Sequence, residues 1–261
     1  MSISKLLVAP LLYFISTVAV AEWTPTEPIN PSDVLNSARQ DRASGEYESA
    51  LQKHLWYHHN ALKHDRSLYG VRLSFALSDW GDLASKYPPA LTALLEEREI
   101  AEGKARDGVD GYSDAFHDFA AINRQFDEHE PVVQLFKYLD RELPESAKKN
   151  VRSARLSLIK SKDYALYTKY LDPEAEIERI QASYLLELEL YAGARYEDDL
   201  KEAAHDSYIE RVTTLVAVLS VTGDDVQAKK MYDKALEKMD TQELRENLDR
   251  ALAGEVPELR A

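Results

Sequence analysis

Cysteine is absent from this 261-residue chain, and glycine is scarce, with 9 residues. The absence of cysteine excludes a disulfide framework, a thiol nucleophile and thiolate metal ligands. The shortage of turn glycines disfavours all-β sandwiches and dinucleotide-binding Rossmann folds. Positive charge is also in deficit, since 32 Lys and Arg oppose 46 Asp and Glu for a formal net charge of −14. A chain this acidic is a poor general nucleic-acid binder, because phosphate contacts need clustered cations.

The residues that are abundant indicate a helical globular protein. Hydrophobic residues make up 44% and charged residues 30% of the chain, which is an ordinary globular balance. The length allows one or two domains and a core that needs no metal. Ala, Leu, Glu, Lys and Arg, all good helix formers, are frequent. The composition therefore predicts an all-α protein.

The first 21 residues are predicted to be a secretory signal peptide. Lys5 precedes an uncharged, mostly apolar run that ends in Ala19-Val20-Ala21, which matches the pattern of a signal-peptidase site. The run is shorter than the roughly 20 residues that span a bilayer. We expect a bacterial exported protein that is periplasmic or secreted. The alternative is an uncleaved signal that anchors the chain in the inner membrane.

The remainder divides into a leader and one helical domain. Residues 22–31 contain three prolines and are predicted to be an extended leader. Residues 32–261 show one helical apolar pattern after another, beginning with Ser32 as a candidate cap. Short turn signals separate these patterns, among them Ser44-Gly45, Tyr87-Pro88-Pro89, Leu143-Pro144, Asp172-Pro173 and Gly223-Asp224.

Several of these turns repeat one pattern at a spacing of about 30 to 40 residues, which is typical of helical solenoids. Residues 45–51 and 85–91 both carry a small residue, a Tyr and then Ala-Leu. In our interpretation the aromatic ring fills the notch between two antiparallel helices, and the alanine lets them approach closely. The residues predicted to be structural on this basis are Tyr47, Ala50, Tyr87 and Ala90.

Residues 223–236 resemble the repeat of tetratricopeptide-like (TPR-like) proteins. The positions that match its consensus are Gly223, Asp224, Ala228, Tyr232, Ala235 and Leu236. Asp225 stands where that consensus has Tyr, and the first unit has His54 at the later aromatic position. The resemblance implies a right-handed solenoid of antiparallel helix pairs, with a concave face for protein or peptide ligands. It implies no catalytic chemistry and no cofactor.

If the resemblance holds, the first helix of each pair lines the concave groove. Counting back from Tyr47 and Tyr87 by helical spacing gives the candidate groove residues Leu35, Arg39, Arg42, Arg72, Phe75, Asp79 and Asp82. In this prediction the charged residues bind a peptide's ends, and Leu35 and Phe75 form an apolar floor. Equally, Arg39 and Arg42 can pair with Asp79 and Asp82 across adjacent helices, which would stabilise the stack only a little.

The function expected from the sequence is non-enzymatic binding of a protein or peptide partner outside the cytoplasm, as a scaffold does. Short motifs for hydrolases, zinc proteases and nucleotide binding are absent. His54 and His58 are four residues apart and could share a helix face for a metal. The alternatives are therefore a small-ligand carrier and a metal-dependent hydrolase that uses His54 and His58.

The signal-peptide prediction can be tested directly. We expect the mature protein to begin at Glu22, because cleavage follows the small residue Ala21. N-terminal sequencing of protein from the cell envelope checks this. A sequence that begins at Met1 in that fraction would contradict it and favour the anchored form.

Overall fold

The structure, a computed structural model, describes residues 23–108 and 115–259. Within these ranges it is all-α and contains no strand, which confirms the predicted fold class. The signal-peptide prediction for residues 1–21 lies outside the described residues. In chain order the helices are α1 (Pro31–Ser44), α2 (Tyr47–His64), the short 3₁₀ helix η1 (Arg66–Leu68), α3 (Tyr69–Leu73), α4 (Phe75–Ala84), α5 (Pro88–Arg106), α6 (Ala115–Gln125), α7 (Glu130–Glu142), α8 (Pro144–Lys160), α9 (Tyr164–Tyr170), α10 (Pro173–Tyr191), α11 (Glu197–Val221), α12 (Asp225–Leu236) and α13 (Gln242–Leu252).

Proline and short polar residues set many of the helix starts. Pro31 and Pro173 are the first residues of α1 and α10, where proline's missing N–H is no loss. The side chain of Asp172 caps α10 by accepting a hydrogen bond from the backbone N–H of Ala175. In α1 the cap is Asn30, whose Oδ1 accepts from the N–H of Ser32 at 3.0 Å. The sequence prediction of Ser32 as the cap is therefore two residues too late, because Asn30 satisfies that role first.

Several helices end at residues in the left-handed backbone conformation, and not all of these residues are glycines. Gly45 ends α1 at φ 85°, and Gly223 follows α11 at φ 83°. These glycines adopt without strain a conformation that side chains with a Cβ avoid. Asp127 and Lys162 also have positive φ, at 53° and 60°. These two turns carry no glycine signal, although Asp is more tolerant of this conformation than Lys.

A break at Ser74 separates α3 from α4. The backbone of Ser74 is non-helical, with φ −126° and ψ −91°, and its hydroxyl donates to the carbonyl of Gly70 at 2.7 Å. Helical spacing no longer relates residues on the two sides of this point. As a result Arg72 is 4% exposed, whereas Phe75, three residues later, is 67% exposed.

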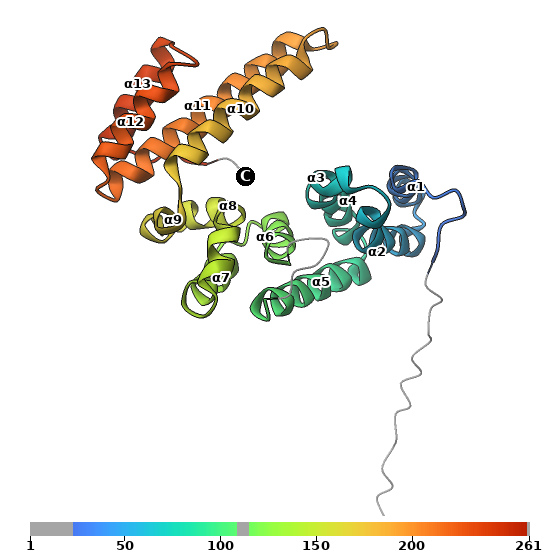
Figure 1. Cartoon of the computed structure of the whole chain (residues 1–261). Coiled ribbons are helices and arrows are strands. Elements are labelled where there is room, and N and C mark those ends of the chain that lie inside the picture. The colour runs from blue at the N-terminus through green and yellow to red at the C-terminus, as the bar shows by residue number, and fades with distance from the viewer. Residues whose placement is uncertain (1–22, 109–114, 260–261) are drawn as a thin grey trace, which may run out of the picture.

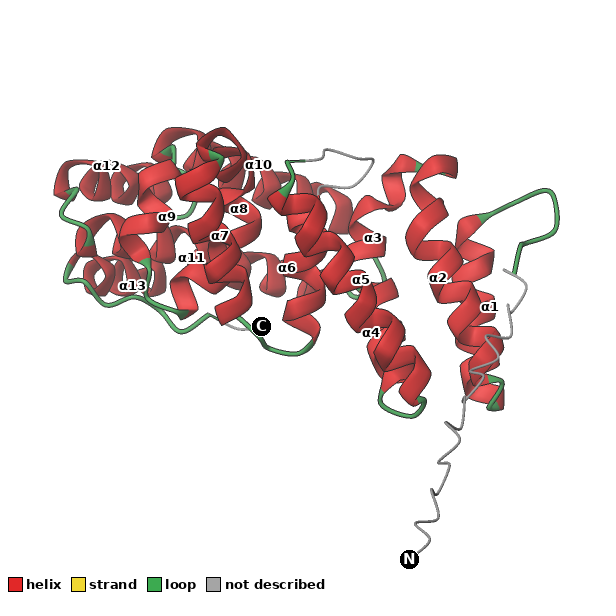
Figure 2. Cartoon of the chain, turned by 90° about the horizontal axis from the view of Figure 1, so that it is seen from below, coloured by secondary structure: helices red, strands yellow, loops and turns green. Residues whose placement is uncertain are grey.

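The helices follow an arc, with α1–α3 at one end and α12 and α13 at the other (Figure 1). Each helix from α4 to α8 contacts the next along the chain, α4 also contacts α6, and α6 contacts α8. In Figure 1, α6 and α8 lie on the inner side of the arc, and α5 and α7 lie on its outer side. Figure 2, turned by 90°, shows the same progression as one row of helices. We call α4, α6 and α8 the inner row.

Both ends of the described chain pack onto the helices. The ring of Trp23 meets the ring of Trp56 edge-on, with centroids 6.4 Å apart, so the leader lies against α2. At the other end Val256 packs against the apolar residues of α10–α13 and also against those of α5–α9. Leu259 is 5% exposed and belongs to the apolar cluster that includes residues of α5–α9. No helix in the described ranges combines the length and the apolar composition needed to cross a membrane.

The contact between the first two repeat turns is close and aromatic. Ala50 and Ala90 are fully buried, and the rings of Tyr47 and Tyr87 lie 6.0 Å apart between centroids. Trp80 adds a hydrogen bond from its indole N–H to the carbonyl of Ala90 at 3.0 Å. The four residues that the sequence predicted to be structural therefore lie at a helix junction.

We expect Ala50→Leu to lower the free energy of unfolding by about 1–3 kcal/mol, because added methyl groups overpack a filled junction. Ala43→Leu is the matched control, since Ala43 is an exposed residue of α1. Urea unfolding followed by circular dichroism measures both variants. Equal stability of the two variants would show that the Ala50 junction is not closely packed.

Candidate functional site

Four of the predicted groove residues form two ion pairs between α1 and α4. Arg39 Nε lies 2.7 Å from Asp79 Oδ2, and Arg42 Nη1 lies 2.5 Å from Asp82 Oδ2. The residues of each pair are 40 positions apart, which is the spacing of the two repeat turns. The pairing that the sequence offered as an alternative is thus present. Both pairs are at least partly exposed to solvent, and pairs of this kind contribute little stability.

Two other predicted groove residues do not face a groove. Leu35 is 3% exposed and packs with Val34 and Trp56, while Trp23 of the leader covers the same cluster. It is part of the core and not of an open apolar floor. Arg72 is buried as well, because the break at Ser74 turns it away from the face that carries Phe75. The two corrections have different causes: a neighbouring cluster covers Leu35, whereas helical spacing fails across the break after Arg72.

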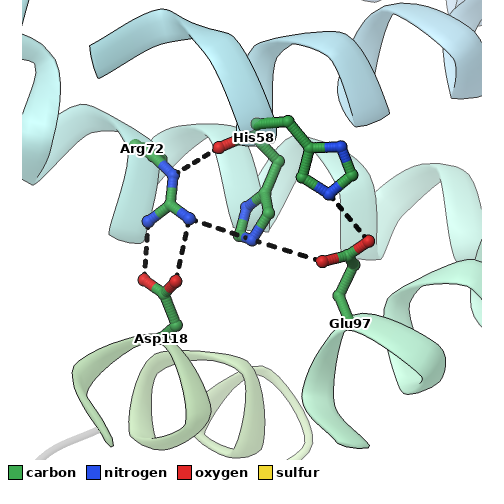
Figure 3. A network of polar contacts seen from close by, with 5 residues as sticks. His58, Arg72, Glu97 and Asp118 are labelled. Atoms are coloured by element: carbon green, nitrogen blue, oxygen red, sulfur yellow. Dashed lines mark hydrogen bonds and ion pairs between the residues drawn. The ribbon is translucent and has the colours of Figure 1, made fainter. Parts of the chain in front are cut away.

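Arg72 lies at the centre of a buried polar network (Figure 3). Its guanidinium forms a two-bond fork with Asp118, from Nη1 to Oδ1 at 2.6 Å and from Nη2 to Oδ2 at 2.9 Å. Its Nε donates to the backbone carbonyl of His58 at 2.7 Å. Asp118 is on α6 and His58 on α2, so one side chain of α3 holds both helices. Such charge-assisted, bidentate bonds fix geometry strongly.

His58 completes this network as a neutral base. Its Nε2 lies 3.0 Å from Arg72 Nη2, which can only donate, so Nε2 is the acceptor and the proton is on Nδ1. Glu97 of α5 is 3.9 Å from the same nitrogen and hydrogen-bonds His59 Nε2 at 2.8 Å. Burial, with the charge of Arg72 as the second cause, lowers the pKa of His58 to about 3.

His54, the other member of the predicted metal pair, is buried apart from carboxylates. Its ring stacks on Trp80 with centroids 5.9 Å apart. Burial, aided by the charges of Arg42 and Arg39, lowers the pKa of His54 to about 4. The described residues include no group of three His, Asp or Glu placed to hold a metal ion. His58 Nε2 is already an acceptor, so this pair does not offer two free ligands.

An open hollow on the inner row is the candidate site that the structure brings together. It has a volume of about 620 Å³ and is formed by one face each of α4, α6 and α8. We call it the arginine hollow, and its lining residues are Ser74, Phe75, Ser78, His117, Arg124, Gln125, Arg152, Ser153, Arg155 and Leu156. Phe75 is the one predicted groove residue among these ten. Its ring is 67% exposed, which is unusual for a large apolar side chain.

The charge of the arginine hollow is entirely positive or neutral. Three of its lining residues are arginines, and none is Asp or Glu. Arg124 Nη2 donates to the backbone carbonyl of Leu73 at 3.0 Å, which ties α6 to the end of α3. Arg155 is 3.8 Å from Glu210 of α11. His117 Nδ1 hydrogen-bonds the hydroxyl of Tyr69 at 2.9 Å. The arrangement can bind anionic groups by charge and forked hydrogen bonds.

Arg124, Arg152 and Arg155 were missed by sequence reasoning, which sought groove residues only near the first two turns. Arg152 and Arg155 are three residues apart and so share a face of α8. That spacing was a usable signal. Arg124 lies near Arg152 and Arg155 only because α6 lies between α4 and α8. No local sequence pattern indicates this arrangement of the helices.

The neutral state of His58 predicts loss of stability in mild acid. An unfolded histidine takes a proton near pH 6.5, whereas folded His58 does so only near pH 3. Below pH 6.5 the unfolded state therefore binds more protons than the folded state, so the free energy of unfolding decreases as the pH is lowered. When the pH is lowered from 7.5 to 5, we expect the free energy of unfolding of His58→Gln to fall by about 1–2 kcal/mol less than that of the wild type. Urea unfolding at both pH values measures this, and equal losses would mean that His58 is not held neutral.

Comparison of the chain with protein-family models, with curated proteins and with solved structures finds no match. An all-α fold serves many unrelated functions, so the fold class by itself assigns none. The arginine hollow, by its chemistry and position, is therefore the feature from which a function can be inferred.

Proposed function

We propose that this chain is a non-enzymatic helical-repeat protein that binds a segment of a partner protein on its inner row, at the arginine hollow. The observation that carries the proposal is an open hollow built by three helices, with the exposed ring of Phe75 at its edge. An exposed aromatic beside arginines is the composition of protein-binding hot spots. The proposal includes export from a bacterial cytoplasm, as the signal-peptide pattern favours.

The packing of the helices supports the finer fold assignment that belongs to this proposal. Helices of the inner row contact one another in series, and α5 contacts α7 behind them. This layering supports the assignment to a TPR-like solenoid of antiparallel helix pairs, in which the first helix of each pair would face the ligand. Solenoids of this kind present extended concave surfaces, which suit extended or helical segments of other proteins.

A small-ligand carrier is the second candidate. The volume of about 620 Å³ is within the range of small-molecule sites. Such sites bury most of the ligand, however, and here Ser74, Phe75, Ser78, Arg124 and Arg152 are all exposed. An open face with this degree of exposure fits a macromolecular segment better.

The absence of cysteine makes position-specific crosslinking a clean test. Ser78→Cys in the arginine hollow and Thr92→Cys on α5 are both exposed sites that can carry one photoactivatable label. We expect the Ser78 label to form one discrete adduct in envelope extract, because the partner lies against α4. The Thr92 label should form no such adduct. Equal adducts from both positions, or none from Ser78, would contradict binding at the hollow.

A charge swap at α1 separates the hollow from the groove predicted first. In the double variant Arg39→Glu, Arg42→Glu the Ser78 adduct should persist, because these arginines pair with Asp79 and Asp82. Stability should fall by about 1–2 kcal/mol, because two ion pairs are lost and each new glutamate faces an aspartate. Loss of the adduct with the helical signal intact would place the partner on α1 instead.

A further inference from the structure

The lining of the arginine hollow is positively charged, although the chain as a whole is acidic. Asp and Glu outnumber Lys and Arg by 46 to 32, so a surface arginine has many carboxylates to pair with. Arg39 and Arg42 each pair with a carboxylate of another helix, and Arg98 pairs with Glu128 in the turn between α6 and α7. In the described part of the chain Arg152 has no such partner, and Arg124 bonds only to a backbone carbonyl. Two of the hollow's three arginines therefore have no carboxylate partner among the described residues, while Arg155 is 3.8 Å from Glu210.

Comparison with the other hollows strengthens this observation. The hollow beside α9 includes Asp224, the one under the C-terminal tail includes Asp127 and Glu258, and the one at the start of α8 includes Glu142 and Glu145. The ten residues of the arginine hollow, in contrast to the lining of these three, include no acidic side chain. Because Glu210 approaches only Arg155, the hollow keeps a net positive charge that attracts an anionic ligand.

The positive charge continues from the hollow toward α11. Burial lowers the pKa of Arg211 on α11, and the nearby charges of Arg179 and Arg155 lower it further. Arg211 is half-buried and has no ion-pair partner among the described residues. Glu176 is bound by Arg179 and Glu210 is near Arg155, and the charges of Glu176 and Glu187 offset part of the positive charge around Arg211.

Resting on the proposed function, we propose that the arginine hollow binds an internal acidic segment of the partner, with two or more carboxylate side chains beside one apolar side chain. Arg152 and Arg155, on adjacent turns of α8, are spaced to receive carboxylates from neighbouring positions of one segment. A guanidinium matches a carboxylate with two parallel hydrogen bonds. The apolar side chain rests on the exposed ring of Phe75. A long polyanion is disfavoured, because the chain's net charge of −14 repels it beyond the hollow.

The test measures fluorescence anisotropy of labelled peptides that are acetylated and amidated, so that no free terminal carboxylate is present. One peptide has Glu-Glu-Phe-Glu-Glu at its centre, and its control has Gln in place of each Glu. We expect the Glu peptide to bind the full chain at least about tenfold more tightly than the Gln peptide. Its affinity should fall as salt is raised.

The protein variants are Arg152→Gln and the matched control Arg195→Gln. Arg195 is also exposed, but it lies next to Tyr196 beyond the inner row. Arg152→Gln should weaken the Glu peptide about fivefold to tenfold, and Arg195→Gln should leave it unchanged. Equal binding of the two peptides, or no effect of Arg152→Gln, would overturn the proposal. So would binding that requires a free C-terminal carboxylate, or Arg152-dependent binding to anionic phospholipid vesicles.

The outcome separates this inference from the proposed function. If Ser78 crosslinks a partner but neither salt nor Arg152→Gln weakens its capture, the acidic preference is wrong and inner-row binding stands. If Ser78 forms no adduct and the Glu peptide does not bind, both proposals are wrong.

Discussion

The fork between Arg72 and Asp118 is the interaction on which the rest of this structure depends. It joins α3 to α6, and Nε of the same arginine holds the carbonyl of His58 on α2. Both charged side chains are at most 9% exposed, so loss of one partner would leave a buried charge, at a cost of about 3–5 kcal/mol. The break at Ser74 is tolerable because the residues before it are fixed in this way. Phe75 can then stay exposed while Arg72 does not.

The helix boundaries that the sequence indicated most clearly are those set by a proline or a glycine. Pro173 and Gly223 mark helix boundaries because proline fits a helix start and glycine a left-handed end. The turns at Asp127 and Lys162 adopt the same left-handed conformation without glycine. The all-α class was predictable, since it follows from composition and periodicity. The break at Ser74 was not, because its hydrogen bond to Gly70 competes locally with an otherwise helical pattern.

The site was predictable only in part, for a different reason. Counting by helical spacing found Phe75, and it found the charges that pair Arg39 with Asp79, because the two turns repeat in register. It placed Arg72 on the wrong face, since counting across Ser74 assumes one continuous helix. The hollow itself depends on three helices meeting, and its arginines come from α6 and α8. Such convergence is a property of tertiary packing, which no single segment encodes.

The packing of the C-terminal tail affects the order in which the parts of the molecule fold. Rows of helices have mostly local contacts, so their folding can begin anywhere and spread to neighbours. Leu259, however, lies in the apolar cluster that contains Phe116 and Val151, and Val256 touches the clusters on both sides. These contacts close a long loop of chain, which is slow compared with the formation of neighbouring helices. The apolar cluster in the middle of the row can therefore be completed only after residues 256–259 have been synthesised.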